Sequence, residues 1–375
     1  MAKIEVREVE STSQLNKFIE YPNILYKDDP NYVAPLTMER KEFFDKNKNP
    51  FYKSAKVNLF LAYDGKKVVG RIATCIDYNY NQYHDENIGS FGFFDCPNDY
   101  EIASTLLKVA MITLKKDGAE KMRGPLNFST NHECGFLVEG FDSPPVVMMT
   151  YNQPYLPKLA EKFGLKKAMD LLALRMYSTD PIPERMQKIV DHLEKRSNIT
   201  VRPMNFKDFD NEIKLAMEVY NKAWEKNWGF VPMDEDEFMF TAKNLKEVAD
   251  PSLILFAEHE GKPIGFVLAL PDINQALKYL KGSLFPFGFL KFLWHTKIRK
   301  KVTGIRLVTF GVVPEYHKRG LDSLMFVHIY HAGVKAGLIE AELSWILETN
   351  DQMLTSAAHM GAKVYKRYRI SEIPL

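Results

Sequence analysis

Residues 306–326 read RLVTFGVVPEYHKRGLDSLMF. An apolar strand pattern runs into a turn that contains Gly320, and an apolar helix pattern begins directly after that turn. The first backbone N–H groups of such a helix have no intrahelical partner and lie at the positive end of its dipole, which suits phosphate. His317, Lys318 and Arg319 add positive charge at the same place. The stretch therefore predicts a phosphate-binding strand–turn–helix unit, with an ordinary β–α turn carrying a basic face as the alternative.

The same order of patterns occurs twice along the 375 residues. Gly70 and Gly265 both follow strand–turn patterns and lie 195 residues apart, and Gly164 and Gly361 both end helix patterns 197 residues apart. Nearly equal offsets over landmarks in the same order are the signature of an internal duplication. Each copy reads as strands alternating with helices, which predicts an α/β (α+β) fold with two twisted sheets in tandem. The predicted domains are 1–178 and 198–375, joined by a helical linker over 179–197.

Each copy carries one insertion relative to the other. In the first copy it lies within 123–151 and in the second it is roughly 271–297. The first insertion contains a polar loop, 124–145, with His132 and Glu133. Long polar loops in compact domains are often functional, so this loop is interpreted as positioning an acceptor molecule, with a self-contained Ω-loop as the alternative. His132 and Glu133 are candidate catalytic bases on that interpretation.

The second insertion contains LFPFGFLKFLW at 284–294, followed by a basic run up to 301. Aromatic residues beside cations suit a peripheral membrane contact through 284–301, and the alternative is a lid packed on the protein. The apolar stretch is far shorter than the ~20 residues of a membrane-spanning helix, and Pro286 and Lys291 interrupt it. An apolar wall near the site suggests an acyl chain or acceptor longer than acetate and a small amine.

The turn resembles the signature of the GNAT superfamily of acyl-CoA-dependent N-acyltransferases, Q/R-x-x-G-x-G/A. The matching string here runs from His317 to Asp322, after Val-Val-Pro-Glu-Tyr at 312–316. The resemblance covers 198–375 well and 1–178 in outline, and it implies two GNAT-like folds in tandem. The tandem arrangement with LFPFGFLKFLW also looks like a bacterial subgroup related to bacterial ceramide synthases.

The resemblance implies that acetyl-CoA or a longer acyl-CoA is the co-substrate, without a metal. Backbone amides of the turn would hold the CoA pyrophosphate, and the preceding strand would polarise the acyl carbonyl through either Val312 or Val313. The residues assigned to this site are Val312, Val313, His317, Lys318, Arg319, Gly320, Leu321, Asp322 and Asn350. Two departures matter: His317 replaces Gln or Arg, and the Asp322 carboxylate would repel phosphate unless it points away. The first copy has DCPNDY at 95–100 instead, so no CoA site is expected there.

The catalytic groups are less defined by the sequence. The position that often carries the family's general acid, a tyrosine, is Ala357 here. Glu348 and Glu342, on the strand pattern 340–348, are candidate bases for the amine, with solvated strand residues as the alternative interpretation. No metal site is predicted, since His132-Glu133-Cys134 lacks a recognised ligand spacing.

The composition indicates which classes of binding partner and which cellular compartment to expect. Lys and Arg number 50 against 48 Asp and Glu, so no global field attracts nucleic acid. Three dispersed cysteines and the absence of a signal-peptide pattern favour a reducing cytoplasm, and the 284–301 segment adds the expectation of a peripheral position at the inner membrane face. The predicted function is an N-acyltransferase that moves an acyl group directly from CoA to an amine. The alternatives are a non-catalytic acyl-CoA or lipid-binding protein of the same fold and an aminoacyl-tRNA-dependent transferase.

Overall fold

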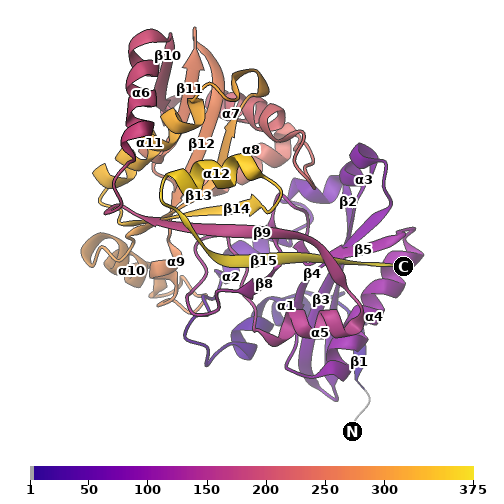
Figure 1. Cartoon of the computed structure of the whole chain (residues 1–375). Helices are drawn as coiled ribbons and strands as arrows, with labels where there is room; N and C mark the ends of the chain where they lie inside the picture. The colour runs from indigo at the N-terminus through magenta and orange to yellow at the C-terminus, as the bar shows by residue number, and fades with distance from the viewer. Residues whose placement is uncertain (1–3) are drawn as a thin grey trace. The chain divides into compact units, whose positions relative to one another are not determined.

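The structure is a computed structural model that describes residues 4–375 (Figure 1). The chain divides into two compact units. The first runs to Leu171 and adds Ala276–Trp294 and Lys366–Leu375; the second comprises Leu172–Gln275 and His295–Tyr365. Both units combine segments from the two halves of the sequence, and the predicted domain boundaries stay a prediction.

The first unit has a mixed sheet. Four strands pair antiparallel in order: β1 (Glu5–Glu8), β2 (Ala55–Asp64), β3 (Lys67–Asp77) and β4 (Ile88–Asp95). The fifth, β5 (Lys121–Gly124), runs parallel to β4 and pairs on its other side with residues 371–374 of β15 (Lys363–Pro374). Short strands follow β5: β6 (Leu126–Asn127), β7 (Glu133–Cys134) and β8 (Phe136–Glu139), of which β8 pairs with β15.

Helices cover both faces of this sheet: α1 (Thr12–Leu25), α2 (Thr37–Phe43), α3 (Tyr78–His84), α4 (Tyr100–Lys116) and α5 (Tyr155–Phe163). Successive side chains of a strand point to opposite faces, and β2 shows the result. Phe60 belongs to the core cluster that contains α4 and α5, whereas Leu61 belongs to the cluster that contains α1.

The second unit repeats this order. Four strands pair antiparallel, β10 (Ile199–Pro203), β11 (Ile254–His259), β12 (Lys262–Pro271) and β13 (Gly304–Val312), and β14 (Glu340–Leu347) runs parallel to β13. The part of β9 (Lys166–Tyr177) that belongs to this unit follows β14. Its helices are α6 (Glu184–Arg196), α7 (Phe209–Trp224), α8 (Glu235–Lys246), α11 (Leu321–Lys335) and α12 (Asp351–His359). The repeated order confirms the prediction of a mixed α/β fold with two similar sets of strands and helices in tandem.

Two further helices, α9 (Asn274–Leu277) and α10 (Gly288–Leu293), lie in the second insertion. Residues 276–294 belong to the first unit, where the Thr37 N–H donates to the Gly282 carbonyl oxygen over 3.0 Å. The hydrogen bond joins the middle of the insertion to the first residue of α2.

The parallel strand pairs separate after a few residues. Strands β13 and β14 are in register only from Gly304 to Leu307, and β13 has an extra residue, Val308, opposite β12. Such a bulge bends its strand and increases the local twist. Because β13 continues to Val312 without β14 beside it, the two strands form a fork, and the fork positions the candidate site.

Candidate active site

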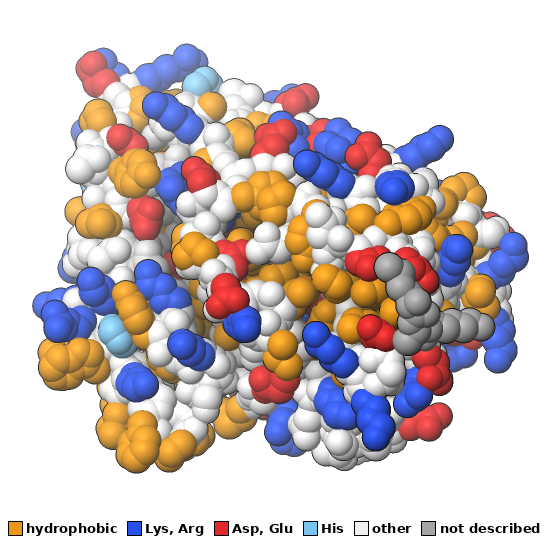
Figure 2. Space-filling model, turned by 90° about the horizontal axis from the view of Figure 1, so that it is seen from below, with side chains coloured by type: hydrophobic (Ala, Val, Ile, Leu, Met, Phe, Trp, Pro, Cys, Tyr) orange, Lys and Arg blue, Asp and Glu red, His pale blue; other side chains and the backbone are white. Residues whose placement is uncertain are grey.

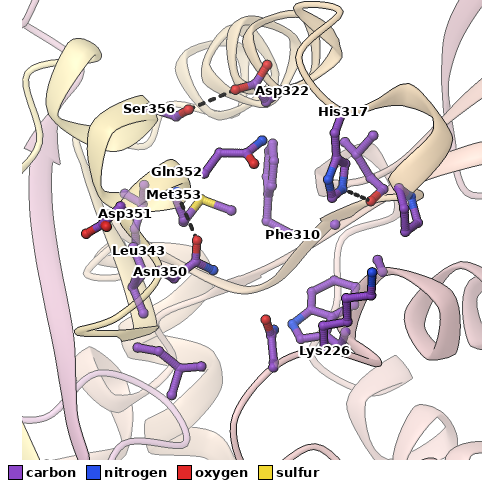
Figure 3. Close-up of a pocket in the computed structure, with 18 of the residues that line it drawn as sticks. Lys226, Phe310, His317, Asp322, Leu343, Asn350, Asp351, Gln352, Met353 and Ser356 are labelled. Carbon is purple, nitrogen blue, oxygen red and sulfur yellow. Dashed lines mark hydrogen bonds between the residues drawn. The ribbon is translucent and has the colours of Figure 1, made fainter.

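A pocket of about 560 Å³ lies in the fork of the second unit (Figure 3). Its walls come from β13, from β14, from the turn before α11, from the start of α12 and from the segment after α7. Figure 3 shows Lys226, Phe310 and Asn350 around the same space. The Phe310 ring stacks on Phe326 of α11 with centroids 4.2 Å apart, which fixes one wall.

The strand before the turn presents one amide to the pocket. The Val313 N–H donates to the Ile264 carbonyl oxygen on β12 over 3.0 Å. Hydrogen-bonded and non-hydrogen-bonded positions alternate along an antiparallel pair, so the N–H of Val312 points away from β12, toward the side that β14 has left. Sequence analysis gave Val312 and Val313 as alternative hydrogen-bond donors to the acyl carbonyl. Because the Val313 N–H is already used in the sheet, the backbone geometry favours the N–H of Val312.

The turn between β13 and α11 has a strained backbone and contacts the end of the strand. Lys318 and Gly320 both have positive φ, 60° and 80°, and the His317 Nε2 lies 2.8 Å from the Val312 carbonyl oxygen (Figure 3). A carbonyl oxygen only accepts, so Nε2 carries the proton. His317 therefore braces the turn onto β13.

Helix α11 begins without a side-chain cap. Its N-cap residue is Gly320, which has no side chain to accept the first amides. A Cβ at Gly320 would lie 2.7 Å from Cγ2 of Ile189, so only glycine fits here. The backbone amides at Leu321 and Asp322 are thus left for another acceptor, which is the arrangement that binds phosphate.

The carboxylate of Asp322, at the start of α11, is the negative charge that could repel a phosphate bound there. Its Oδ2 accepts a hydrogen bond from the Ser356 Oγ over 2.8 Å, which ties the carboxylate to α12 (Figure 3). Asn350, also assigned to the site, caps α12 instead, because its Oδ1 accepts from the Met353 N–H over 3.1 Å. Both side chains line the pocket, and both have a structural partner.

The corresponding fork of the first unit is filled. A Cβ at Gly92 of β4 would lie 1.9 Å from the Leu126 carbonyl oxygen, and the Phe93 N–H donates to Asn127 Oδ1 over 2.7 Å. Helix α4 is also capped, since the Asp99 side chain accepts from the N–H groups of residues 101 and 102. The first insertion therefore occupies the space that is open in the second unit. The absence of a CoA site in the first copy stays a prediction.

The two glutamates that the sequence offers as bases have different surroundings. Glu342 lies on β14, and Glu348 directly follows it. Glu342 is buried, and its Oε1 accepts from the Ser344 Oγ over 2.5 Å, while its other oxygen accepts from the Tyr365 hydroxyl. The Ser344 Oγ accepts from Arg306 Nε over 3.0 Å and lines the pocket. Burial and the neighbouring Glu342 raise the pKa of Tyr365. Glu342 thus reaches the pocket through Ser344, whereas Glu348 is outside the pocket lining.

His132 and Glu133 lie in the first unit and do not line this pocket. Phe43 and Phe51 contact the His132 ring edge-on, and Nδ1 lies 2.9 Å from the Ser129 Oγ. Burial lowers the pKa of His132 to about 4. Burial alone would raise the pKa of Glu133, but its ion pair with Arg40 holds that pKa below the usual value. This arrangement is that of a packed structural cluster, so their role as bases stays a prediction without geometric support.

The buried His132 predicts a pH effect on stability. In the unfolded chain the imidazole titrates near 6.5, and in the folded protein its pKa is about 4, so the unfolded state binds more protons between these values. Stability is therefore lost as the pH falls through this window. Relative to His132→Gln, the wild-type free energy of unfolding should drop by about 1–2 kcal/mol more between pH 7 and pH 4.5 in urea titrations. Parallel curves for the two proteins would refute the assignment.

Several pocket residues escaped prediction from the sequence. Trp224 ends α7 and packs on Gly311, where a Cβ would lie 2.2 Å from Cζ3 of the indole. Lys226 follows directly, and Phe310 faces the pocket from β13. The run KAWEKNWG at 222–229 is a signal, because aromatic and basic residues after a helix often line sites, but its contact with β13 is long-range. Within residues 4–375, no group of three His, Cys, Asp or Glu could hold a metal ion.

Two mixed α/β units in tandem, with an open fork above an uncapped helix in one of them, have the arrangement of the tandem GNAT fold. A solved structure supports this: a tandem GNAT protein from the clavulanic acid biosynthesis pathway matches 99% of this chain and 98% of its own, with a TM-score of 0.59 and 10% identity. The fold of the chain is therefore the tandem GNAT fold.

No family model matches the chain. Two curated proteins are similar over nearly their whole length. Protein YghO of Escherichia coli K12 is 36% identical over 98% of this chain and 94% of its own. The bacterial ceramide synthase of Caulobacter vibrioides is 37% identical over 99% of this chain and 97% of its own. The chain belongs to the family of these two proteins.

Proposed function

We propose that the protein transfers an acyl group from acyl-CoA to an amine acceptor. The observation that carries the proposal is the fork of β13 and β14, where the Val312 amide points away from β12 and α11 begins without a side-chain cap. The donors fit the co-substrate: the amides of 318–322 suit a pyrophosphate, and Val312 suits a carbonyl oxygen on which negative charge develops.

The reaction needs no covalent intermediate with the protein. The amine nitrogen attacks the thioester carbon, the new C–N bond forms, and the C–S bond breaks to release CoA. A base must remove a proton from the amine, and we assign this role to Glu342 acting through Ser344, the hydroxyl that joins the buried carboxylate to the pocket. The departing thiolate takes up a proton and leaves as free CoA.

The test is release of free thiol from acyl-CoA thioesters of increasing chain length in the presence of a panel of amines. The proposal expects thiol release that depends on the amine, together with an amide product identified by mass spectrometry. Tight binding without thiol release for any amine would favour the non-catalytic alternative. Absence of acyl-CoA binding would overturn the proposal.

We further propose that the acceptor is a long-chain amine. One relative is named a ceramide synthase, and the second insertion offers a surface that matches such a substrate. Large hydrophobic side chains stand exposed along it: Phe285, Phe287, Phe289, Leu290, Leu293, Trp294 and Ile298. Exposed cationic side chains lie between these residues and directly after them in the sequence: Lys291, Lys297, Arg299, Lys300 and Lys301.

Such a surface suits a bilayer with anionic headgroups. Apolar side chains enter the interface while cations remain at headgroup level. Figure 2 shows hydrophobic side chains standing out at the lower left edge, with Lys and Arg side chains nearby. Within residues 4–375, no helix has the length and apolarity to cross a bilayer.

Substitution of Phe287 tests the membrane contact. Its side chain is 69% exposed, so Phe287→Asp should leave folding intact while placing a charge where the interface is apolar. Co-sedimentation with vesicles containing phosphatidylglycerol should fall about tenfold. Ile112→Asp is the matched control, because Ile112 on α4 is 68% exposed. Equal sedimentation of wild type and Phe287→Asp would favour the packed-lid alternative.

A further inference from the structure

A second hollow of the second unit lies beside the turn before α11. It has a volume of about 630 Å³ and lies between α6 and Arg319. Ile189 and Leu193 of α6 form its apolar part, and a Cβ at Gly320 would lie 2.7 Å from the first and 3.4 Å from the second. The helix therefore packs directly on the residue that begins α11, so the hollow adjoins the predicted pyrophosphate site.

Its polar lining is mainly cationic. Arg185, Lys188 and His192 come from one face of α6, and Arg319 comes from the turn. The acidic member is Glu184, whose Oε1 lies 2.7 Å from Lys188 Nζ in an exposed pair. Without His192, the hollow is lined by three cationic side chains and one carboxylate. Exposed pairs of this kind contribute little, so Lys188 can turn to another anion at small cost.

Two of these cations have no acidic partner. Across residues 4–375, no carboxylate lies within ion-pair distance of Arg185 or Arg319. The Arg319 guanidinium instead lies 5.1 Å from the centroid of the Tyr316 ring, which orients it at the edge of the turn. An arginine pair beside an apolar floor is an arrangement that binds a phosphate carried by an organic group.

We infer that this hollow binds the 3′-phosphate of CoA, with Arg185 of α6 and Arg319 of the turn as its main ligands. The inference rests on the proposed function and extends it, because it makes the helix between the two sequence halves a part of the co-substrate site. The ligand is a phosphomonoester dianion. Its charge matches the excess of two positive charges in the hollow, and it belongs to the same molecule whose pyrophosphate would lie on the adjoining turn.

The experiment compares CoA with 3′-dephospho-CoA by titration calorimetry. Wild type should bind CoA about tenfold more tightly, the fold-change expected for one charge-assisted hydrogen-bonded contact. The double variant Arg185→Gln/Arg319→Gln should bring the two affinities within about twofold of each other. Arg185→Gln alone, which leaves the turn before α11 intact, should reduce the preference for CoA and keep the affinity for 3′-dephospho-CoA nearly unchanged, which a misfolded variant would not do.

Controls separate the hollow from general charge effects. Lys214→Gln removes an exposed cation of α7 and should keep the tenfold preference. Glu184→Gln should increase it. Equal affinity of wild type for both nucleotides would overturn the inference and leave the proposed function standing, whereas absence of binding by either would overturn the proposed function. Inorganic phosphate that binds in an Arg185-dependent way, without a preference for CoA, would show a free-anion site and also overturn the inference.

Discussion

Val312→Pro is expected to reduce kcat by about 10²–10³ with little change in acyl-CoA affinity. Proline removes the N–H that we assign to the thioester carbonyl oxygen, and losing one such donor typically has an effect of this size. Because the neighbouring Val313 N–H makes the ladder bond to Ile264, position 312 contributes no N–H to the pairing with β12. Folding should therefore be retained, as checked by thermal unfolding alongside the kinetic assay.

Val313→Pro is the matched control for this substitution. It removes the donor to Ile264 and should lower the free energy of unfolding by about 1–3 kcal/mol, without a specific loss in kcat for the folded fraction. Unchanged kcat in a folded Val312→Pro protein would show that the acyl carbonyl is polarised elsewhere. A large loss of acyl-CoA affinity would indicate that the proline ring blocks the pocket.

Arg306→Met is expected to lower the free energy of unfolding by about 3–5 kcal/mol. Arg306 and Glu342 are buried at 2% and 3% exposure, and they face each other in the register of β13 and β14. The guanidinium donates to the Ser344 hydroxyl, which in turn donates to the Glu342 carboxylate. Removing one charge of such a buried set leaves the other without compensation, which is the reason for the large effect.

The double variant Arg306→Met/Glu342→Leu separates charge from packing. It removes both buried charges and should recover most of the lost stability in urea titrations, because no carboxylate remains uncompensated. A double variant as unstable as the single one would show that Arg306 acts through its contacts with the Trp345 ring and the Ser344 backbone. If Glu342 is the base, the double variant should be folded and inactive.

The fold could be predicted from the sequence because its signals are local and repeated. The strand–turn–helix pattern around Gly320 and the offset between Gly70 and Gly265 needed no knowledge of long-range contacts. The structure and the tandem GNAT neighbour confirm that prediction. The positive φ of Gly320 suits glycine, whereas the positive φ of Lys318 in the same turn has no counterpart in the sequence pattern.

The rest of the site depends on register and on contacts between distant segments. Val312 and Val313 are chemically identical, and only the pairing with β12 distinguishes their amides. The orientation of Asp322 depends on Ser356, which lies 34 residues away. The composition of the first insertion favours an acceptor loop, whereas Leu126 and Asn127 fill the fork beside Gly92, a close approach that no local pattern reveals.

Hydrogen exchange with and without CoA probes the proposed main-chain site itself, because it reports on backbone amides and the chain supplies its own comparison. CoA should slow exchange in peptides that cover 312–323, where the Val312 amide and the start of α11 are available. Peptides that cover 93–102 should not change, since their amides already have partners in Asn127 and Asp99. Unchanged exchange over 312–323, or slowing confined to 93–102, would be incompatible with CoA binding at the turn before α11.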